Sequence, residues 1–190
     1  VLDREERLAG ATMPGLAAMI TEKYRQRYRL SQSRLQRILC RIALKNHENG
    51  SKNPFAQFQQ PVSEEAYYGS KMVADPLRLY DCSPITDGAA AVVLTSEATD
   101  LVISGIGHGT GPVSLRERDS FTSFQATRIA AQKAYGMAAI GPKDIDFAEV
   151  HDAFTPFEII CTEDLGFFHA GCADHLPVEI EGPEMEGALE

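Results

Sequence analysis

The sequence predicts an α/β fold in which a helical region, residues 1–75, precedes a region of mixed helix and sheet, residues 76–190. Three observations predict this organisation. Apolar residues recur at helical spacing before residue 50, a continuous apolar run follows an Asp-Gly turn at residues 87–88, and a short apolar strand near residue 150 leads directly into a helical pattern. The order strand, helix, strand favours a parallel or mixed sheet.

Two amphipathic helices are expected in the first region. The first follows Met13, Pro14 and Gly15, and the second begins after Ser31, whose hydroxyl is a good helix cap, and ends near Gly50. Their spacing predicts that one face of each helix is buried. The residues of these two faces are Leu16, Met19, Ile20, Tyr24 and Tyr28 in the first helix, and Leu35, Ile38, Leu39 and Ile42 in the second.

The second region contains the expected sheet. Residues 89–94 and 101–106 read as strands, the first of them a small-to-branched apolar run that would be covered on both faces. A helix over residues 122–137 connects them to a third strand at residues 147–150. Residues 96–100 are too short for a full crossover helix, so we expect residues to be missing near positions 96–101.

The junction after the third strand is the stretch with the clearest chemical interest. His151 follows the strand, and Thr155 with Pro156 supplies a cap and a first-turn proline for the next helix. Ligands collect at such edges of α/β sheets, and an imidazole there can move protons or polarise a carbonyl. A structural histidine fits the position as well, and Asp152 could orient the ring or cap the helix.

Three weaker motifs have simpler interpretations. The glycine-rich stretch at residues 105–111 lacks the helix that a phosphate cradle requires, so a structural turn is favoured. His47, close to a helix carboxyl end, is most simply a partner of the helix dipole. His169, Cys172 and His175 have metal-like spacing but are too few for a structural zinc, and we predict no metal.

Composition narrows the classes of protein. The net charge is −9, yet residues 1–75 hold 12 Lys and Arg against 8 Asp and Glu. These basic residues are dispersed along helices without a nucleic-acid motif, so no nucleic-acid partner is predicted. The sequence has no apolar run long enough to span a membrane, and its four irregularly spaced cysteines predict free thiols. We expect a cytoplasmic protein.

Four blocks of the sequence resemble the thiolase superfamily, in particular its sterol-carrier-protein type and the acetyl-CoA acetyltransferase branch. The blocks are KNHENGSKNPFAQF, ADPLRLYDCSPITDGAAAVVL, ISGIGHGT and KDIDFAEVHDAFTPFEIICTEDLGF. The resemblance implies a partial thiolase-like fold, a layered α/β/α arrangement with a mixed sheet plus a helical loop domain, here residues 1–75. It also implies that residues 76–190 span the end of the first half and the start of the second half of that fold.

The resemblance also implies roles for three residues. His151 stands where this branch has a histidine that helps form the oxyanion hole of the thioester, Phe154 matches a phenylalanine of the acyl or pantetheine pocket, and Ser83 matches a position near the coenzyme A chain. Cys82 does not match the family's nucleophile, and no counterpart of the nucleophilic cysteine loop is found.

The implied function is that of a thiolase-like acyl-CoA acyltransferase present as an incomplete chain. We expect the parent protein to be an enzyme and this chain alone to be inactive. Acyl-CoA or coenzyme A would be its substrate, with no other cofactor, and a homo-oligomer with a possible accessory subunit is expected. The alternatives are a non-catalytic acyl-CoA-binding scaffold or partner subunit, and a lyase that acts on acyl-CoA side chains.

Overall fold

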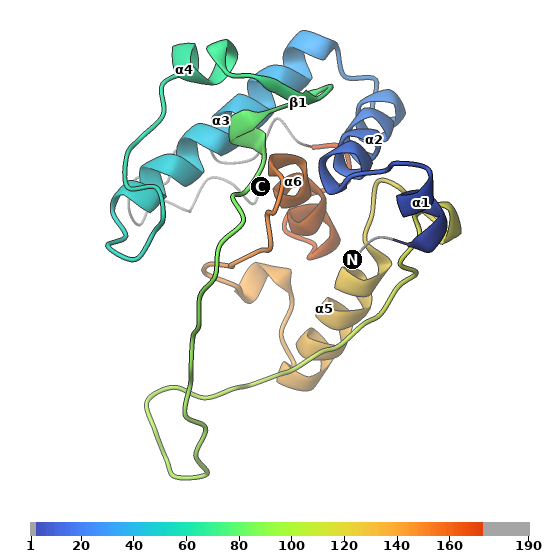
Figure 1. The fold of residues 1–190 in the computed structure, drawn as a ribbon. Coiled ribbons are helices and arrows are strands. Elements are labelled where there is room, and N and C mark those ends of the chain that lie inside the picture. Colours follow the sequence, from blue (N-terminus) through green and yellow to red (C-terminus); the bar gives the residue numbers. More distant parts are fainter. Residues whose placement is uncertain (1–2, 173–190) are drawn as a thin grey trace.

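The first part of the chain folds into helices that begin at hydroxyl caps. In the computed structural model, which describes residues 3–172, the Thr12 hydroxyl accepts a hydrogen bond from Gly15 N and the Ser31 hydroxyl accepts one from Arg34 N, both at 3.2 Å. The cap predicted at Ser31 is therefore confirmed. The helices are α1 (Arg4–Leu8), α2 (Met13–Arg27), α3 (Gln32–Ser51) and α4 (Glu64–Gly69) (Figure 1).

The second part contains a small hairpin and two further helices. Strands β1 (Met72–Ala74) and β2 (Leu77–Arg78) pair antiparallel, with Met72 opposite Arg78 and Ala74 opposite Leu77. The helix predicted over residues 122–137 is confirmed, with slightly shifted ends. The remaining elements are the 3-10 helices η1 (Leu79–Asp81), η2 (Leu115–Glu117) and η3 (Pro142–Asp144), and the α-helices α5 (Gln125–Ala138) and α6 (Thr155–Asp164).

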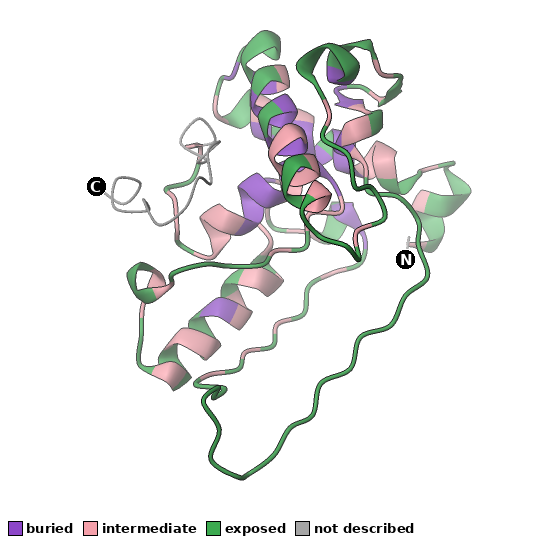
Figure 2. Ribbon diagram, turned by 90° about the vertical axis from the view of Figure 1, so that its left-hand side faces the viewer, coloured by how far each residue is buried: buried purple, intermediate pink, exposed green. Residues whose placement is uncertain are grey.

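The core lies between α2, α3 and α6. Leu35 and Leu39 of α3 and Ile159 and Ile160 of α6 are at most 1% exposed, and each contributes about 2 kcal/mol by leaving water. Figure 2 shows this buried centre in purple, surrounded by half-buried and exposed turns. The predicted buried faces of α2 and α3 are largely confirmed, but Met19 is 54% exposed and belongs to the surface.

The strands predicted at residues 89–94, 101–106 and 147–150 are not formed. These segments have no regular secondary structure, and Val93, Leu101 and Phe147 are 93%, 89% and 84% exposed. A strand is stabilised by hydrogen bonds to a neighbouring strand, and the only sheet in residues 3–172 is the β1–β2 hairpin. The apolar runs lack pairing partners in this part of the chain, which explains why the predicted positions were wrong.

The glycine-rich stretch at residues 105–111 packs against a helix instead of forming a turn. Gly105, Gly107 and Gly109 lie so near α5 that a Cβ atom would stand 2.3, 1.8 and 2.3 Å from the carbonyl oxygens of Ala134, Ala130 and Ala126. Residues 83–112, which contain no helix or strand, loop away from the helices and then run back beside α5 (Figure 1). A structural role was predicted correctly, but its physical basis is close backbone approach rather than turn geometry.

None of the helices in the described residues is long and apolar enough to cross a membrane.

Candidate functional site

Two distant sequence blocks meet at the start of α6. Cys82 and Phe154 form an isolated antiparallel bridge, and Ser83 N donates a 3.0 Å hydrogen bond to the carbonyl of Ala153. The block that contains Ser83 is thereby fixed beside the loop that carries His151 and Phe154. The structure brings two of the three predicted site residues, Ser83 and Phe154, into direct proximity.

A buried carboxylate strengthens this junction. Asp81 is 1% exposed and accepts hydrogen bonds from the Thr155 hydroxyl at 2.7 Å, from the Tyr67 hydroxyl at 2.8 and 2.9 Å, and from Arg78 N at 2.7 Å. Burial raises the pKa of Asp81, and its hydrogen bonds partly offset that rise. Thr155 was predicted to cap α6, but its hydroxyl binds Asp81 and the residue occupies the first position of the helix.

A second polar cluster joins α3 to the same loop. Asn46 Nδ2 donates to Asp152 Oδ2 at 2.6 Å and to Glu158 Oε2 at 3.1 Å, and Lys45 Nζ lies 2.5 Å from Glu158 Oε1. Glu158 is 7% exposed, so its charge is compensated within the protein. These contacts connect Asn46, in the first of the four blocks, to Asp152 beside His151, and connect Lys45 of the same block to Glu158 of α6.

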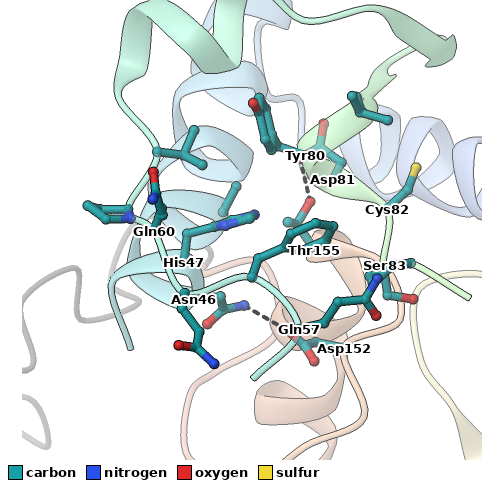
Figure 3. A pocket seen from close by; sticks show the side chains of 17 residues that line it. Asn46, His47, Gln57, Gln60, Tyr80, Asp81, Cys82, Ser83, Asp152 and Thr155 are labelled. Atoms are coloured by element: carbon teal, nitrogen blue, oxygen red, sulfur yellow. Dashed lines mark hydrogen bonds between the residues drawn. The ribbon is translucent and has the colours of Figure 1, made fainter. Parts of the chain in front are cut away.

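A cavity of about 880 Å³ opens between these elements, and we call it the His47 cavity. Its polar walls hold Asn46, His47, Gln57, Gln60, Ser83 and Asp152. Figure 3 shows His47 and Tyr80 lying between Gln60 on one side and Ser83 with Asp152 on the other. The arrangement offers amide, hydroxyl and imidazole groups to one ligand.

His47 is part of the wall of this cavity. Its ring meets Tyr80 edge-on at 5.4 Å between centroids and lies 6.0 Å from the ring of Phe58. Burial lowers the pKa of His47, and a backbone hydrogen bond with Gln60 only partly opposes this. α3 ends at Ser51, one turn after His47, so an interaction of His47 with the helix dipole stays a prediction.

His151 faces a different space. It lines a cavity of about 520 Å³, here the His151 cavity, together with Met13, Leu16, Pro112, Arg118 and Phe157. Its side chain is exposed, whereas Asp152, the next residue, lines the His47 cavity. Neighbouring residues of the loop thus line two cavities, Asp152 together with Ser83 the His47 cavity and His151 the His151 cavity.

Phe154 is a core residue. It is 7% exposed and packs edge-on against Phe157, with 5.3 Å between ring centroids. It is not among the residues that line either of these two cavities. Contact of Phe154 with an acyl or pantetheine group stays a prediction.

Three of the four cysteines are poorly suited to nucleophilic chemistry. Burial raises the pKa of Cys40, Cys82 and Cys161 to about 11, so all three are thiols at neutral pH. Asp81 adds to the rise at Cys82, which lines the His47 cavity. Cys40 and Cys161 are buried in the core, as their positions on apolar helix faces predicted.

The metal-like spacing of His169, Cys172 and His175 can be checked only in part, because His175 lies outside the described residues. His169 accepts a backbone hydrogen bond from Cys172 N at 3.1 Å, which closes a turn. Within residues 3–172, His, Cys, Asp and Glu side chains form no group of three or more that could hold a metal ion.

Sequence reasoning alone assigned no role to Asn46 or Asp81. The available signal was a run of three polar residues, Lys45-Asn46-His47, at the end of an amphipathic helix. The hydrogen-bond partners of Asn46, Asp152 and Glu158, lie more than 100 residues away in sequence, and helical periodicity does not reveal such contacts.

Comparison of the chain with known proteins shows similarity to thiolases. Residues 107–181 match the family described as thiolase C-terminal domain-like. The recognition of the thiolase superfamily from the four sequence blocks is confirmed by this match and by the relatives below.

The chain is 42% identical over 169 residues to an acetyl-CoA acetyltransferase of Methanothermobacter thermautotrophicus, a match that covers 85% of this chain and 43% of the relative. Human sterol carrier protein 2 is 32% identical over 147 residues, 70% of this chain and 26% of that protein. The solved structure of an Ltp2-ChsH2(DUF35) aldolase aligns with a TM-score of 0.75 and 26% identity over 91% of this chain and 50% of that one. The chain thus spans less than half the length of these curated relatives, and a partial thiolase-like α/β fold is confirmed.

Proposed function

We propose that this chain supplies part of the acyl-CoA site of a thiolase-type acyltransferase. The observation that carries the proposal is the hydrogen bond from Ser83 N to the Ala153 carbonyl, which fixes the Ser83 block beside the His151 loop. In this proposal Ser83 contacts the coenzyme A chain in the His47 cavity. His151 stabilises the oxyanion of the thioester from the His151 cavity.

The chemistry assigned to His151 is stabilisation of charge. An imidazole N–H directed at the thioester oxygen lowers the energy of the tetrahedral intermediate, in which that oxygen becomes negative. Covalent acyl transfer also needs an activated thiolate. Cys40, Cys82 and Cys161, with pKa values raised by burial, are poorly suited to supply it. Because no counterpart of the nucleophilic cysteine loop was matched either, we expect the chain by itself to be inactive.

Two measurements test the proposal. Isothermal titration of the 190-residue chain should detect acetyl-CoA binding that Ser83→Trp weakens, because the indole would fill the cavity beside Ser83. In a thiolase-length polypeptide that contains this chain, His151→Ala should reduce kcat about 100- to 1000-fold, with a smaller change in KM. Unchanged kcat per folded molecule would contradict the assignment of His151.

A lyase is the second candidate. The Ltp2-ChsH2(DUF35) structure is named an aldolase, and it aligns with 91% of this chain. Its name also includes a second component, which supports the proposal that an accessory subunit joins this chain. Release of a carbonyl product from an acyl-CoA side chain, without any dependence on free coenzyme A, would distinguish a lyase from a thiolase.

A further inference from the structure

A side chain of α3, that of Asn46, binds the loop that carries His151. Asn46 directs its two amide N–H groups to two acidic residues, Asp152 at 2.6 Å and Glu158 at 3.1 Å. Lys45 compensates the charge of Glu158 from the preceding position of α3. The Asp152 carboxylate is therefore bound by a residue of a rigid helix, although Asp152 itself belongs to a segment without regular secondary structure.

Capping of α6 does not explain the position of Asp152. The cap residue of α6 is Phe154, and the helix has no side-chain cap hydrogen bond. The Asp152 carboxylate instead accepts from Asn46, while the main chain of the next residue, Ala153, accepts from Ser83. Two consecutive residues after His151 are thus anchored to two different parts of the protein.

We propose that Asn46 is a positioning residue for His151. By holding Asp152, it sets the direction in which the backbone leaves His151 and so fixes where the imidazole stands in the His151 cavity. The inference rests on the proposed function, in which that imidazole is the oxyanion donor. Asn46 itself lines the His47 cavity and not the His151 cavity.

The chemistry of asparagine suits this role better than that of its close analogues. Aspartate is nearly isosteric, but it has no N–H donor and would place a third carboxylate beside Asp152 and Glu158. Leucine has a similar size and would leave the Asp152 carboxylate without this donor. Both changes should release the loop, and they do so by different physical means.

Nuclear magnetic resonance of the 190-residue chain tests the proposal without any assay of turnover. The ring signals of His151, assigned with a His151→Gln variant, are compared between variants at one fixed pH. Asn46→Asp and Asn46→Leu should both shift these signals. Asn49→Asp is the matched control, because Asn49 is exposed on the same helix, and this change should leave the signals where they are.

The outcomes separate this inference from the proposed function. Ring signals that match the Asn49 control, in folded Asn46 variants, would overturn the positioning role even if thermal stability fell. Ring signals that move while the wild-type chain binds no acetyl-CoA would uphold the positioning role and contradict the proposed function. Asn46→Ser, which keeps a donor on a shorter side chain, should give a smaller shift and serves if the other variants do not fold.

Discussion

The hydroxyl of Thr155 donates a 2.7 Å hydrogen bond to the buried carboxylate of Asp81. This contact joins the 3-10 helix that precedes Ser83 to the first residue of α6, 74 positions further along the chain. Together with the bond from Ser83 N to the Ala153 carbonyl, it determines how the two blocks of the candidate site lie against each other.

Removal of the Thr155 hydroxyl should therefore loosen the junction. Thr155→Val keeps the shape of the side chain but withdraws one donor from a buried charged acceptor, which should lower the free energy of unfolding by about 2 kcal/mol. Urea denaturation measures the loss. Thr99→Val is a suitable control, because the Thr99 hydroxyl bonds only to an exposed backbone carbonyl nearby. Equal stability of the two variants would contradict the importance of the Asp81 contact.

Glu163 makes stability depend on pH. Its carboxylate is half-buried, it accepts from the Tyr24 hydroxyl and from Gly171 N, and its Oε2 has no partner among the described residues. Burial raises the pKa of Glu163 above its usual value, so the folded state binds the proton more tightly than the unfolded state does. The stabilisation is present below pH 4.5 and is lost as pH rises through the raised pKa.

Glu163→Gln should abolish this part of the pH dependence. The amide keeps an oxygen for Tyr24 and Gly171 but carries no charge, so the variant should gain stability relative to wild type as pH rises from 5 to 8. Thermal unfolding across that pH range measures the difference. The stability of the variant should still fall somewhat as pH rises, because burial also raises the pKa values of Asp81 and Asp164. Parallel stability curves for the two proteins would refute the role of Glu163.

Lys45 should matter far more to stability than Lys52, the C-cap residue of the same helix. Lys45 and Glu158 are 16% and 9% exposed at the side chain, so Lys45→Met leaves a buried carboxylate with less compensation and should cost about 3 kcal/mol. Lys52→Met breaks an ion pair with Glu48 whose side chains are 65% and 53% exposed, and should cost less than about 0.5 kcal/mol. Chemical denaturation of both variants makes the comparison, and similar losses would argue against a buried charge pair.

The sequence allowed the helices and their packing to be predicted but not the sheet. Leu35, Leu39 and their neighbours show helical spacing, and the Ser31 cap is a local signal, so both could be inferred without the rest of the protein. Residues 89–94 and 101–106 have strand composition, but strands also require partners, and the described residues contain none for them. The roles of His151 and Ser83 were proposed from their positions in the resembling blocks. Asn46 and Asp81 lie in these blocks too, but their hydrogen bonds to Asp152, Glu158 and Thr155 join segments far apart in the sequence, which no local pattern reveals.

The unpaired apolar segments should promote self-association. Val92, Val93, Leu101 and Val102 are all more than 80% exposed, and chains with unpaired backbone and apolar side chains pair readily with other copies. Sedimentation velocity should show oligomers whose proportion rises with concentration. Val93→Lys together with Val102→Lys should shift the distribution toward monomer, and a wild-type chain that stays monomeric at high concentration would contradict the prediction.

Gly107 should tolerate no side chain. A Cβ atom there would lie 1.8 Å from the Ala130 carbonyl oxygen and 2.7 Å from its carbon, and both are backbone atoms of α5 that cannot rotate away. Gly107→Ala must therefore push the segment off the helix, at a cost of about 2 kcal/mol or more. Gly111→Ala is the matched control, because a Cβ atom at Gly111 meets nothing within 4 Å. The control should be neutral or slightly stabilising, since alanine restricts the unfolded chain more than glycine does. Equal unfolding free energies for the two variants would show that the segment does not lie against α5, whereas a loss confined to Gly107→Ala would establish the contact that the alternating glycines permit.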